Sequence, residues 1–465
     1  MENRIKFLIK NTSILTISSF SSKVLVFFLV PLYTNVLSTE EYGVYDLIMS
    51  IIQLCIPIFT LNIVDGVLRF SMDKTEDRNQ VKSIGLYNIV VSIFAFTVVL
   101  LINYFYSIWT VTRGLEIYIW LYFVFFVFNQ LLIHVAKGQE QVKELGVAGV
   151  ISTIASIFGN IMFLVILPLR IRGFFLAYIM GQVLSALYLC LKTKFIKGLS
   201  FNINIDLKKR MYAYSFPLIL GTLGWLINNI SDRFVVSWMC GLADNGIYSV
   251  AYKIPTIITT IQNIFLQAWT ISAIKEYKQD DSLIFYRKMF FCLNAIMVLS
   301  CSILIILTKN IAHVLYVKDF YAAWQYVPFL LISVVFGAAA GFIGPILSAK
   351  MDSKAIATST IFGAIINFVL NIILILAMGP QGAAIATAAS SFAIYIIRKK
   401  SLGNLLSDNR YMVIMSSWLM LVIQATLMIM DNSTLWQIPI IIANICFYRF
   451  EFIAVIKKSK GILFK

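Results

Sequence analysis

Histidine is scarce in this sequence, and the patterns that carry enzyme chemistry are missing. The two histidines, His134 and His313, are too far apart in the expected topology to share a metal ion. The six cysteines are scattered without a C-x-x-C pair, so we expect neither a zinc site nor a disulfide framework. P-loop, G-x-G-x-x-G, H-E-x-x-H and G-x-S-x-G patterns are all absent. We therefore expect no enzyme, no metal or cofactor, and no function driven by ATP.

Charged residues are scarce as well. They make up 13% of the chain and hydrophobic residues 60%, whereas ordinary soluble domains are about 25% charged. The mean hydropathy is +0.86. Because a helix of about 20 apolar residues spans a bilayer, we expect an all-α integral membrane protein with about 14 transmembrane helices. The segments lie near 12–33, 43–63, 83–106, 115–136, 145–168, 173–191, 213–238, 247–269, 289–308, 327–349, 355–378, 382–397, 411–430 and 434–449.

The basic residues are distributed unequally between the two sides of the membrane. With a cytoplasmic N-terminus, 30 of the 38 Lys and Arg residues fall in inside loops and tails, and five fall outside. This bias predicts that both termini are cytoplasmic. The first 22 residues have a basic head like that of a signal peptide, but Lys23 interrupts the apolar run and no small-residue cleavage site follows, so we expect a retained helix. The net charge of +16 then reflects topology and contact with anionic lipids, and no nucleic-acid partner is expected.

Two halves of the sequence resemble each other. Residues 42–45 (Tyr-Gly-Val-Tyr) match 245–248 (Asn-Gly-Ile-Tyr) at an offset of 203, and 173–177 match 382–386 at an offset of 209. Six helices per half is an even number, which predicts a parallel repeat of two six-helix bundles, as in two-bundle transporters. The expected organisation is an N-terminal bundle at 1–191, a basic cytoplasmic linker at 192–212, a C-terminal bundle at 213–400, and two extra helices with a basic tail at 401–465.

Four of the apolar segments carry polar residues on one helix face, three of them at steps of three and four and the third more loosely, at steps of seven and four. The first stripe is Thr12, Thr16, Ser19 and Lys23, and the second is Asp46, Ser50, Gln53, Pro57 and Thr60. The third is Ser215, Thr222, Asn229 and Arg233, and the fourth is Ser249, Lys253, Thr256, Thr260, Asn263 and Gln267. A charge facing lipid at the centre of a membrane costs about 2.5–3.5 kcal/mol, so we expect the stripes to line a polar interior. Pro57 and Pro255 permit kinks in two of these helices.

The charges of this interior are mainly positive. Lys23 lies too deep in its segment to reach the surface, whereas Arg233 and Lys253 lie nearer the outer side, where snorkelling is an alternative explanation. Asp232 adjoins Arg233 without facing it, so we expect Asp232 to pair across helices with Lys253 or Lys23. Arg69 is placed to guard the cytoplasmic mouth. Lys and Arg bind phosphate oxygens strongly away from water, while amide groups such as those of Asn229, Asn263 and Gln267 suit sugar hydroxyls.

Several of these segments also resemble a known family. Residues 42–45, Gly66 with 68–70 (Leu-Arg-Phe), 231–233 (Ser-Asp-Arg) and 246–253 are similar to polysaccharide-transport members of the multidrug/oligosaccharidyl-lipid/polysaccharide exporter superfamily. The resemblance runs from about residue 10 to 400, and the last helix pair matches the fourteen-helix branch. It implies a Wzx-like flippase that moves undecaprenyl-pyrophosphate-linked oligosaccharide across the bacterial cytoplasmic membrane for surface polysaccharides such as O-antigen or capsule. Such proteins are thought to alternate between inward and outward states around a cationic cavity.

In this hypothesis Lys23, Arg233 and Lys253 hold the pyrophosphate, and Asp46 or Asp232 takes a proton or a sodium ion. The expected partners are the lipid-linked oligosaccharide, anionic lipids, and the polymerase and glycosyltransferases of the same synthesis. One alternative is an ion-coupled multidrug exporter of the same superfamily, which usually has an acidic cavity. A membrane enzyme acting on lipid-linked sugars lacks a sizeable outer loop to hold its catalytic residues, and a scaffold protein has no need of charged stripes.

Overall fold

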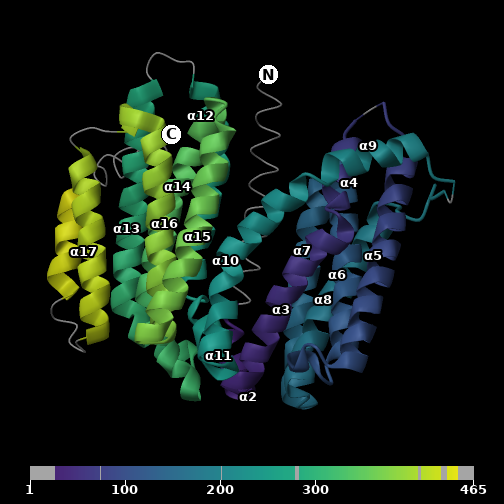
Figure 1. Ribbon diagram of the computed structural model, residues 1–465, viewed down its shortest axis with the longest axis horizontal. Coiled ribbons are helices and arrows are strands. Elements are labelled where there is room, and N and C mark those ends of the chain that lie inside the picture. The colour runs from purple at the N-terminus through teal and green to yellow at the C-terminus, as the bar shows by residue number, and fades with distance from the viewer. Residues whose placement is uncertain are drawn as a thin grey trace, which may run out of the picture. The chain divides into compact units, whose positions relative to one another are not determined.

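The computed structural model describes residues 27–73, 75–200, 202–277, 282–406, 410–430 and 437–448. All regular secondary structure in these ranges is helical (Figure 1). Eleven helices within them are long and apolar enough to cross a membrane. The prediction of an all-α, multi-pass integral membrane protein is therefore confirmed. Most of the first predicted segment, including Lys23, lies outside the described residues, and the last corresponds to a short apolar helix, Gln437–Tyr448.

The chain forms two compact units, Met1–Ile230 (unit 1) and Ser231–Lys465 (unit 2), which are described separately. Unit 1 contains α7 packed along α8, α6 along α8, and α4 against α6 and α9. Its helices are α2 (Val30–Val36), α3 (Thr39–Thr60), α4 (Ile63–Ser71), α5 (Arg78–Tyr106), η1 (Thr110–Thr112), α6 (Glu116–Gly138), α7 (Val142–Asn160), η2 (Ile161–Ile166), α8 (Arg170–Lys192) and α9 (Ile205–Ser215). The next helix, α10 (Leu218–Met239), continues from unit 1 into unit 2. The linker expected at 192–212 between the two bundles of the predicted repeat remains a prediction.

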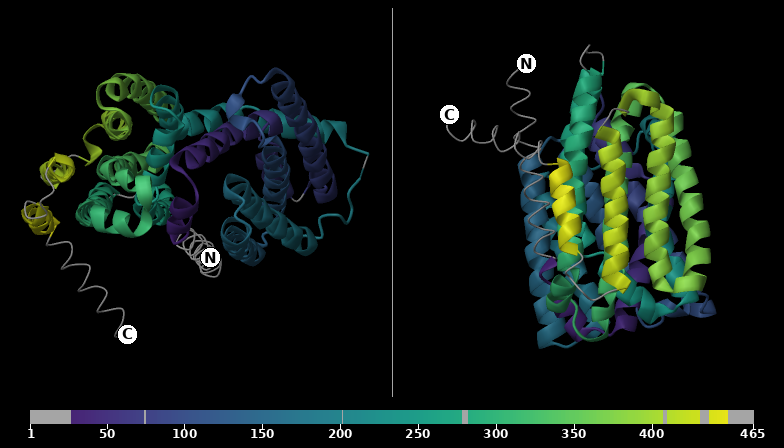
Figure 2. Two further views of the ribbon diagram at one scale, coloured as in Figure 1. Left: turned by 90° about the horizontal axis from the view of Figure 1, so that it is seen from below. Right: turned by 90° about the vertical axis from the view of Figure 1, so that its left-hand side faces the viewer.

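Unit 2 is built around α14, which packs against α12, α13 and α16, while α15 lies along α16 (Figure 2). All of the α14 residues from Leu330 to Ser333 are buried. Its helices are α11 (Leu242–Ala251), α12 (Pro255–Glu276), α13 (Ser282–Leu315), η3 (Lys318–Gln325), α14 (Val327–Ala349), α15 (Ser353–Met378), α16 (Pro380–Leu402), η4 (Gly403–Leu406) and α17 (Arg410–Met430).

Local sequence signals account for several helix starts. Ser38 begins α3 with a reciprocal capping box, in which the Glu41 amide donates to Ser38 Oγ at 3.1 Å and the Ser38 amide donates to the Glu41 carboxylate at 2.9 Å. Asp77 and Asn204 accept from the first amides of α5 and α9. Each cap satisfies amides that the helix itself leaves unpaired.

Two glycines at matching positions of the predicted repeat make similar contacts, one in each unit. Gly173 in the first turn of α8 packs against the backbone of Phe163, and a Cβ there would lie 2.6 Å from the Phe163 carbonyl oxygen. Gly382 in the first turn of α16 packs in the same way against the Leu374 carbonyl at the end of α15. Only glycine allows such close contact between backbones, which explains why this residue appears at both positions.

Two of the predicted continuous helices are broken. The segment expected at 43–63 runs as α3 and α4, which are separated by Leu61 and Asn62 in left-handed conformation at φ 51° and φ 50°. The segment expected at 247–269 is divided into α11 and α12 by a turn at 252–254. Pro255 marks the second break, because it is the first residue of α12, the position at which a helix tolerates a residue without an amide proton. Pro57 lies inside α3, so the first break falls four residues after the proline rather than at it.

Candidate functional site: polar groups within each unit

A buried carboxylate lies at the centre of the polar groups of unit 2. The Asp232 side chain on α10 is 3% exposed. The hydroxyl groups of Tyr248 and Tyr252 both donate to its Oδ2 atom, the first at 2.8 Å, and the Arg233 amide donates to Oδ1 at 3.0 Å. Buried charges require such compensation, because an isolated carboxylate in an apolar interior is very costly. The break between α11 and α12 sets the position of Tyr252, which begins the turn.

The predicted pairing of Asp232 with Lys253 is wrong. Lys253 adjoins Tyr252 in the turn at 252–254, and its side chain is half-buried, but the carboxylate bonds to the two tyrosines instead. The alternative partner, Lys23, lies outside the described residues. Tyr248 and Tyr252 were not among the predicted site residues, although their spacing of four residues places them on one helix face.

Positive charge lies close to this carboxylate. The guanidinium carbon of Arg233 lies 5.2 Å from the centre of the Tyr252 ring, which is a cation–π contact. Arg233 and Lys253 are both half-buried. Unit 2 thus brings Asp232 and Arg233 of α10 together with Tyr248 and Tyr252, and Lys253 follows Tyr252 in the turn between α11 and α12.

A row of exposed polar residues continues along α12. Thr256, Asn263, Gln267 and Thr270 are all exposed within unit 2, and they fall at helical spacing on one face. Asn229 on α10 is exposed too, and its amide donates to the Trp225 carbonyl at 2.6 Å. Since polar groups are unfavourable against lipid, this face of α12 is unsuited to a lipid environment.

The second predicted stripe is only partly accessible. Ser50, Pro57 and Thr60 on α3 are buried inside unit 1, and the Thr60 hydroxyl donates to the carbonyl of Ile56 at 2.7 Å. Asp46 is half-buried near the start of α3. Burial of Ser50 and Thr60 within the unit means that this stripe contributes mainly to packing.

Unit 1 has its own polar cavity, at the α3–α4 break. The cavity has a volume of about 580 Å³, and Asp65, Arg69, Tyr214 and Thr222 are among its lining residues. Asn62, at the break, donates to Thr222 Oγ1 at 2.9 Å and so ties α4 to α10. Arg69 lines this cavity together with Asp65, one helical turn before it, which was not among the predicted site residues. The predicted role of Arg69 at the cytoplasmic mouth stays a prediction.

The segment between α8 and α9 is held firmly to the start of α5. Lys82, which is 5% exposed, donates to the carbonyls of Phe195 and Lys197 at 3.5 and 3.0 Å. Further along, Gln80 donates to the Asn202 carbonyl at 3.0 Å and accepts from the Asn204 amide at 3.1 Å. This part of the predicted linker is thus anchored to unit 1.

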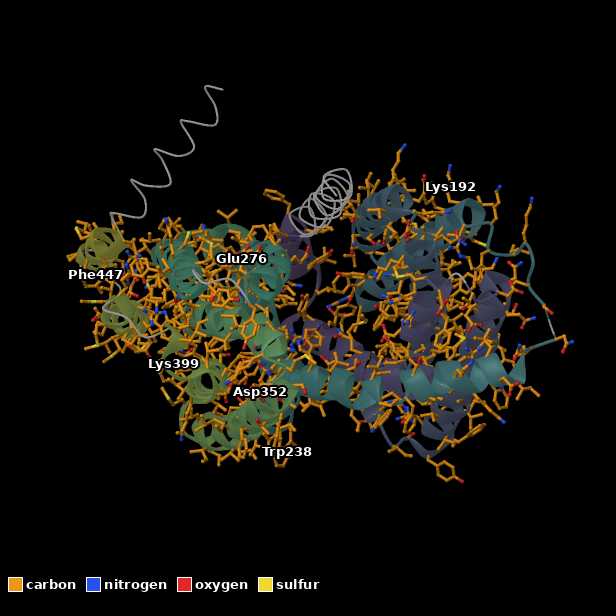
Figure 3. All side chains as sticks on the ribbon, turned by 90° about the horizontal axis from the view of Figure 1, so that it is seen from above. Lys192, Trp238, Glu276, Asp352, Lys399 and Phe447 are labelled. Carbon is orange, nitrogen blue, oxygen red and sulfur yellow. The ribbon has the colours of Figure 1, made fainter. Side chains whose placement is uncertain are left out.

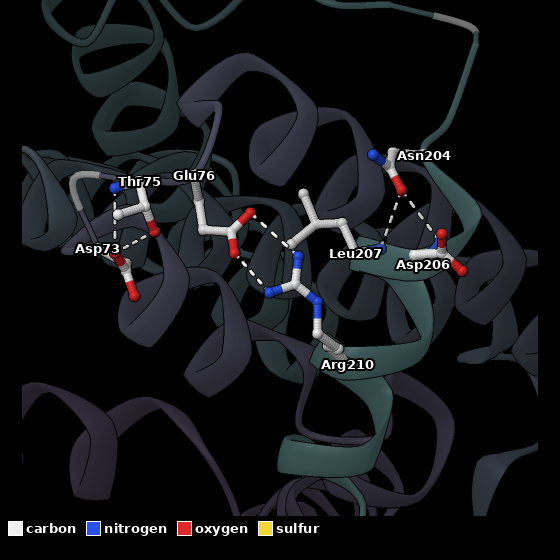
Figure 4. A network of polar contacts seen from close by, with 7 residues as sticks. All are labelled: Asp73, Thr75, Glu76, Asn204, Asp206, Leu207 and Arg210. Atoms are coloured by element: carbon white, nitrogen blue, oxygen red, sulfur yellow. Dashed lines mark hydrogen bonds and ion pairs between the residues drawn. The ribbon is translucent and has the colours of Figure 1, made fainter.

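A second set of contacts fixes α9 to the loop before α5 (Figure 4). Arg210 donates to both carboxylate oxygens of Glu76, at 2.6 and 3.3 Å, and these hydrogen bonds raise the pKa of the Arg210 guanidinium. Asp73 accepts from the side chain and amide of Thr75, which lowers the pKa of its carboxyl group. Asn204 caps α9 beside them.

One end of unit 2 carries many basic residues. The helix ends that form it can be located in Figure 3 by three labelled residues: Glu276 at the end of α12, Asp352 at the start of α15 and Lys399 near the end of α16. Lys350 donates to the Ser401 carbonyl at 3.4 Å, which brings the α14–α15 turn next to the end of α16. Lys288, Lys354 and Lys400 lie on the adjoining helix ends. This clustering is consistent with the asymmetry of basic residues along the sequence.

Within the described residues, no group of three or more His, Cys, Asp and Glu side chains is arranged to hold a metal ion.

Comparison with known proteins identifies the family. A family model described as "Polysaccharide biosynthesis protein" matches residues 8–271. The chain is also 24% identical over 279 residues to "Probable low-salt glycan biosynthesis flippase Agl15" of Haloferax volcanii. This alignment covers 57% of the chain and spans 56% of the relative's length, little more than half.

Solved structures share the fold. The lipid II flippase MurJ in an inward closed conformation has a TM-score of 0.69 at 17% identity, covering 96% of this chain and 99% of MurJ. An inward-facing multidrug resistance MATE transporter has a TM-score of 0.68 at 14% identity, covering 83% of this chain and 95% of the transporter. These likenesses confirm the transporter fold implied by the sequence resemblance. With a family match over more than half of its length, the chain belongs to the polysaccharide biosynthesis protein family.

Proposed function

We propose that this protein is a flippase that moves a pyrophosphate-linked oligosaccharide, carried on undecaprenol, from the cytoplasmic to the outer leaflet of the bacterial cytoplasmic membrane. Membership of the polysaccharide biosynthesis family and the name of the Haloferax volcanii relative, a glycan biosynthesis flippase, support a glycan as the cargo. The product would serve surface polysaccharides such as O-antigen or capsule. Polymerase and glycosyltransferases would then be functional partners, and both termini of the chain would be cytoplasmic.

The observation that carries the proposal is the combination of charge and polarity in unit 2. Arg233 and Lys253 stand beside the α11–α12 break, and the exposed amides of Asn263 and Gln267 follow along α12. Guanidinium and ammonium groups bind phosphate oxygens strongly where water is excluded. The amides both donate and accept hydrogen bonds, as sugar hydroxyls require. Within unit 2 we assign the pyrophosphate to Arg233 and Lys253, and the glycan to the exposed amides of α12. Lys23 and Asn229 keep their predicted roles in binding the pyrophosphate and the glycan.

Asp232 is the proposed site of coupling to an ion. Its carboxylate is buried and bonded to two phenol groups, so taking up a proton or a sodium ion would change the charge of this region by one unit. In a medium of low polarity such a change strongly alters the electrostatic energy of the nearby Arg233 side chain. Asp46 on α3 is the second candidate for this role.

Reconstitution in proteoliposomes tests the proposal. The wild-type chain is expected to make an undecaprenyl-pyrophosphate oligosaccharide accessible to an external glycosidase, and empty liposomes are not. The MATE fold favours one competing function, export of amphipathic cations. If the protein moves such a cation and leaves the lipid-linked oligosaccharide in place, the exporter assignment replaces the flippase.

A further inference from the structure

The cavity of unit 1 has the size of a small-molecule site. Its volume is about 580 Å³, within the range of about 300–1,000 Å³ typical of ligand pockets. One part of the wall is polar and comes from Asp65, Arg69 and Tyr214; another part is apolar and includes Leu68, Met72 and Pro217. The two parts meet where α4 passes the junction of α9 and α10.

The polar groups of this wall retain hydrogen-bonding capacity. Within the described residues, Arg69 and Tyr214 make no side-chain hydrogen bond or ion pair, and the Asp65 carboxylate lies 3.9 Å from His134 Nε2. Arg210, at the same end of unit 1, is by contrast bound by both oxygens of Glu76. The Tyr214 ring lies edge-on to Phe70, with ring centres 6.3 Å apart.

This chemistry differs from that of a phosphate site. The negative charge of Asp65 on the wall opposes that of a phosphate and offsets the attraction of Arg69. A carboxylate accepts hydrogen bonds, a guanidinium donates them and a phenol does both. A neutral sugar ring matches all three groups through its hydroxyls, and its C–H face matches the apolar wall of Leu68, Met72 and Pro217.

We propose that this cavity is a binding subsite for a neutral sugar ring of the glycan headgroup, held by Asp65, Arg69 and Tyr214. The inference rests on the proposed function and adds to it a separate site for the sugar, distinct from the cationic groups of unit 2. Asp65 accepts hydrogen bonds from sugar hydroxyls, Arg69 donates to sugar oxygens, and Tyr214 orients the ring at the edge of the cavity.

Binding of two soluble analogues to the purified full-length protein, measured by calorimetry, tests the subsite. One analogue is farnesyl pyrophosphate, and the other is farnesyl pyrophosphate linked to N-acetylglucosamine. Wild type is expected to bind the sugar-bearing analogue more tightly. Asp65→Asn and Tyr214→Phe should each weaken that binding about tenfold, the value of one hydrogen bond to a charged or buried group, and leave binding of farnesyl pyrophosphate unchanged.

Asp73→Asn is the matched control, because Asp73 lies outside the cavity and is bonded to Thr75. This variant is expected to bind both analogues like wild type. The subsite is overturned if wild type binds the two analogues equally, or if the cavity variants weaken both alike or neither. If wild type binds neither analogue, the proposed function itself fails and the subsite with it, which separates the two failures. Thermal unfolding of each variant verifies that it is folded.

Discussion

The hydrogen bonds to Asp232 should be among the most sensitive contacts of unit 2. Tyr252→Phe and Tyr248→Phe each remove one donor from a carboxylate that is 3% exposed. A hydrogen bond to a charged group contributes about 1.5–3 kcal/mol, and each substitution leaves the buried carboxylate with two of its three donors. Each substitution is therefore expected to lower the free energy of unfolding by about 1.5–3 kcal/mol. Tyr87→Phe, which removes an exposed hydroxyl, should change it by less than about 0.5 kcal/mol.

A double-mutant cycle isolates the interaction from the general cost of losing a hydroxyl. Denaturant unfolding of the purified protein would be measured for wild type, Tyr252→Phe, Asp232→Asn and the double variant. Because the hydroxyl bonds to the carboxylate, Tyr252→Phe should cost less in the Asp232→Asn background, with a coupling of at least about 1 kcal/mol. Additive effects of the two substitutions would refute the reasoning and with it the arrangement of this site.

Two further predictions concern packing within single units. Lys82→Met removes both hydrogen bonds to the Phe195 and Lys197 carbonyls, so limited trypsin digestion should cut the 193–200 segment faster than in wild type; an unchanged rate would show that this anchor does not hold the segment. Gly382→Ala places a methyl group against the Leu374 carbonyl and should destabilise unit 2 by about 1–3 kcal/mol, whereas Gly337→Ala meets open space and should have little effect in the same unfolding experiment.

The sequence predicted the membrane helices well where apolar runs end in clear signals. The segment expected at 327–349 coincides with α14, since Tyr326 and Lys350 bound an uninterrupted apolar run. The paired glycines at 173 and 382 were likewise visible as a pattern, because each reflects a local backbone requirement. The capping box at Ser38, which begins α3 before the expected residue 43, was not predicted. Hydropathy therefore locates helices, and small residues locate their closest contacts.

The breaks and the partners of buried charges were not predictable in the same way. Leu61 and Asn62 lie within an apolar window, and nothing in hydropathy distinguishes a left-handed residue from a helical one. The pairing of Asp232 depended on which way its side chain points, and the turn at Pro255 brings Tyr252 rather than Lys253 to it. Charge attraction predicted a lysine as the partner of Asp232, whereas the structure places a tyrosine hydroxyl beside its carboxylate.

The central proposal is that the cationic groups of unit 2, Arg233 and Lys253, bind the pyrophosphate of a lipid-linked glycan. Its most direct test compares translocation of an undecaprenyl-pyrophosphate oligosaccharide in proteoliposomes by wild type, Lys253→Ala and Lys354→Ala. Lys354 is an exposed lysine at the start of α15 and serves as the matched control. We expect Lys253→Ala to slow translocation about ten- to a hundredfold, equivalent to one charged contact of about 1.5–3 kcal/mol, and Lys354→Ala to match wild type. Equal translocation by all three proteins would contradict the account.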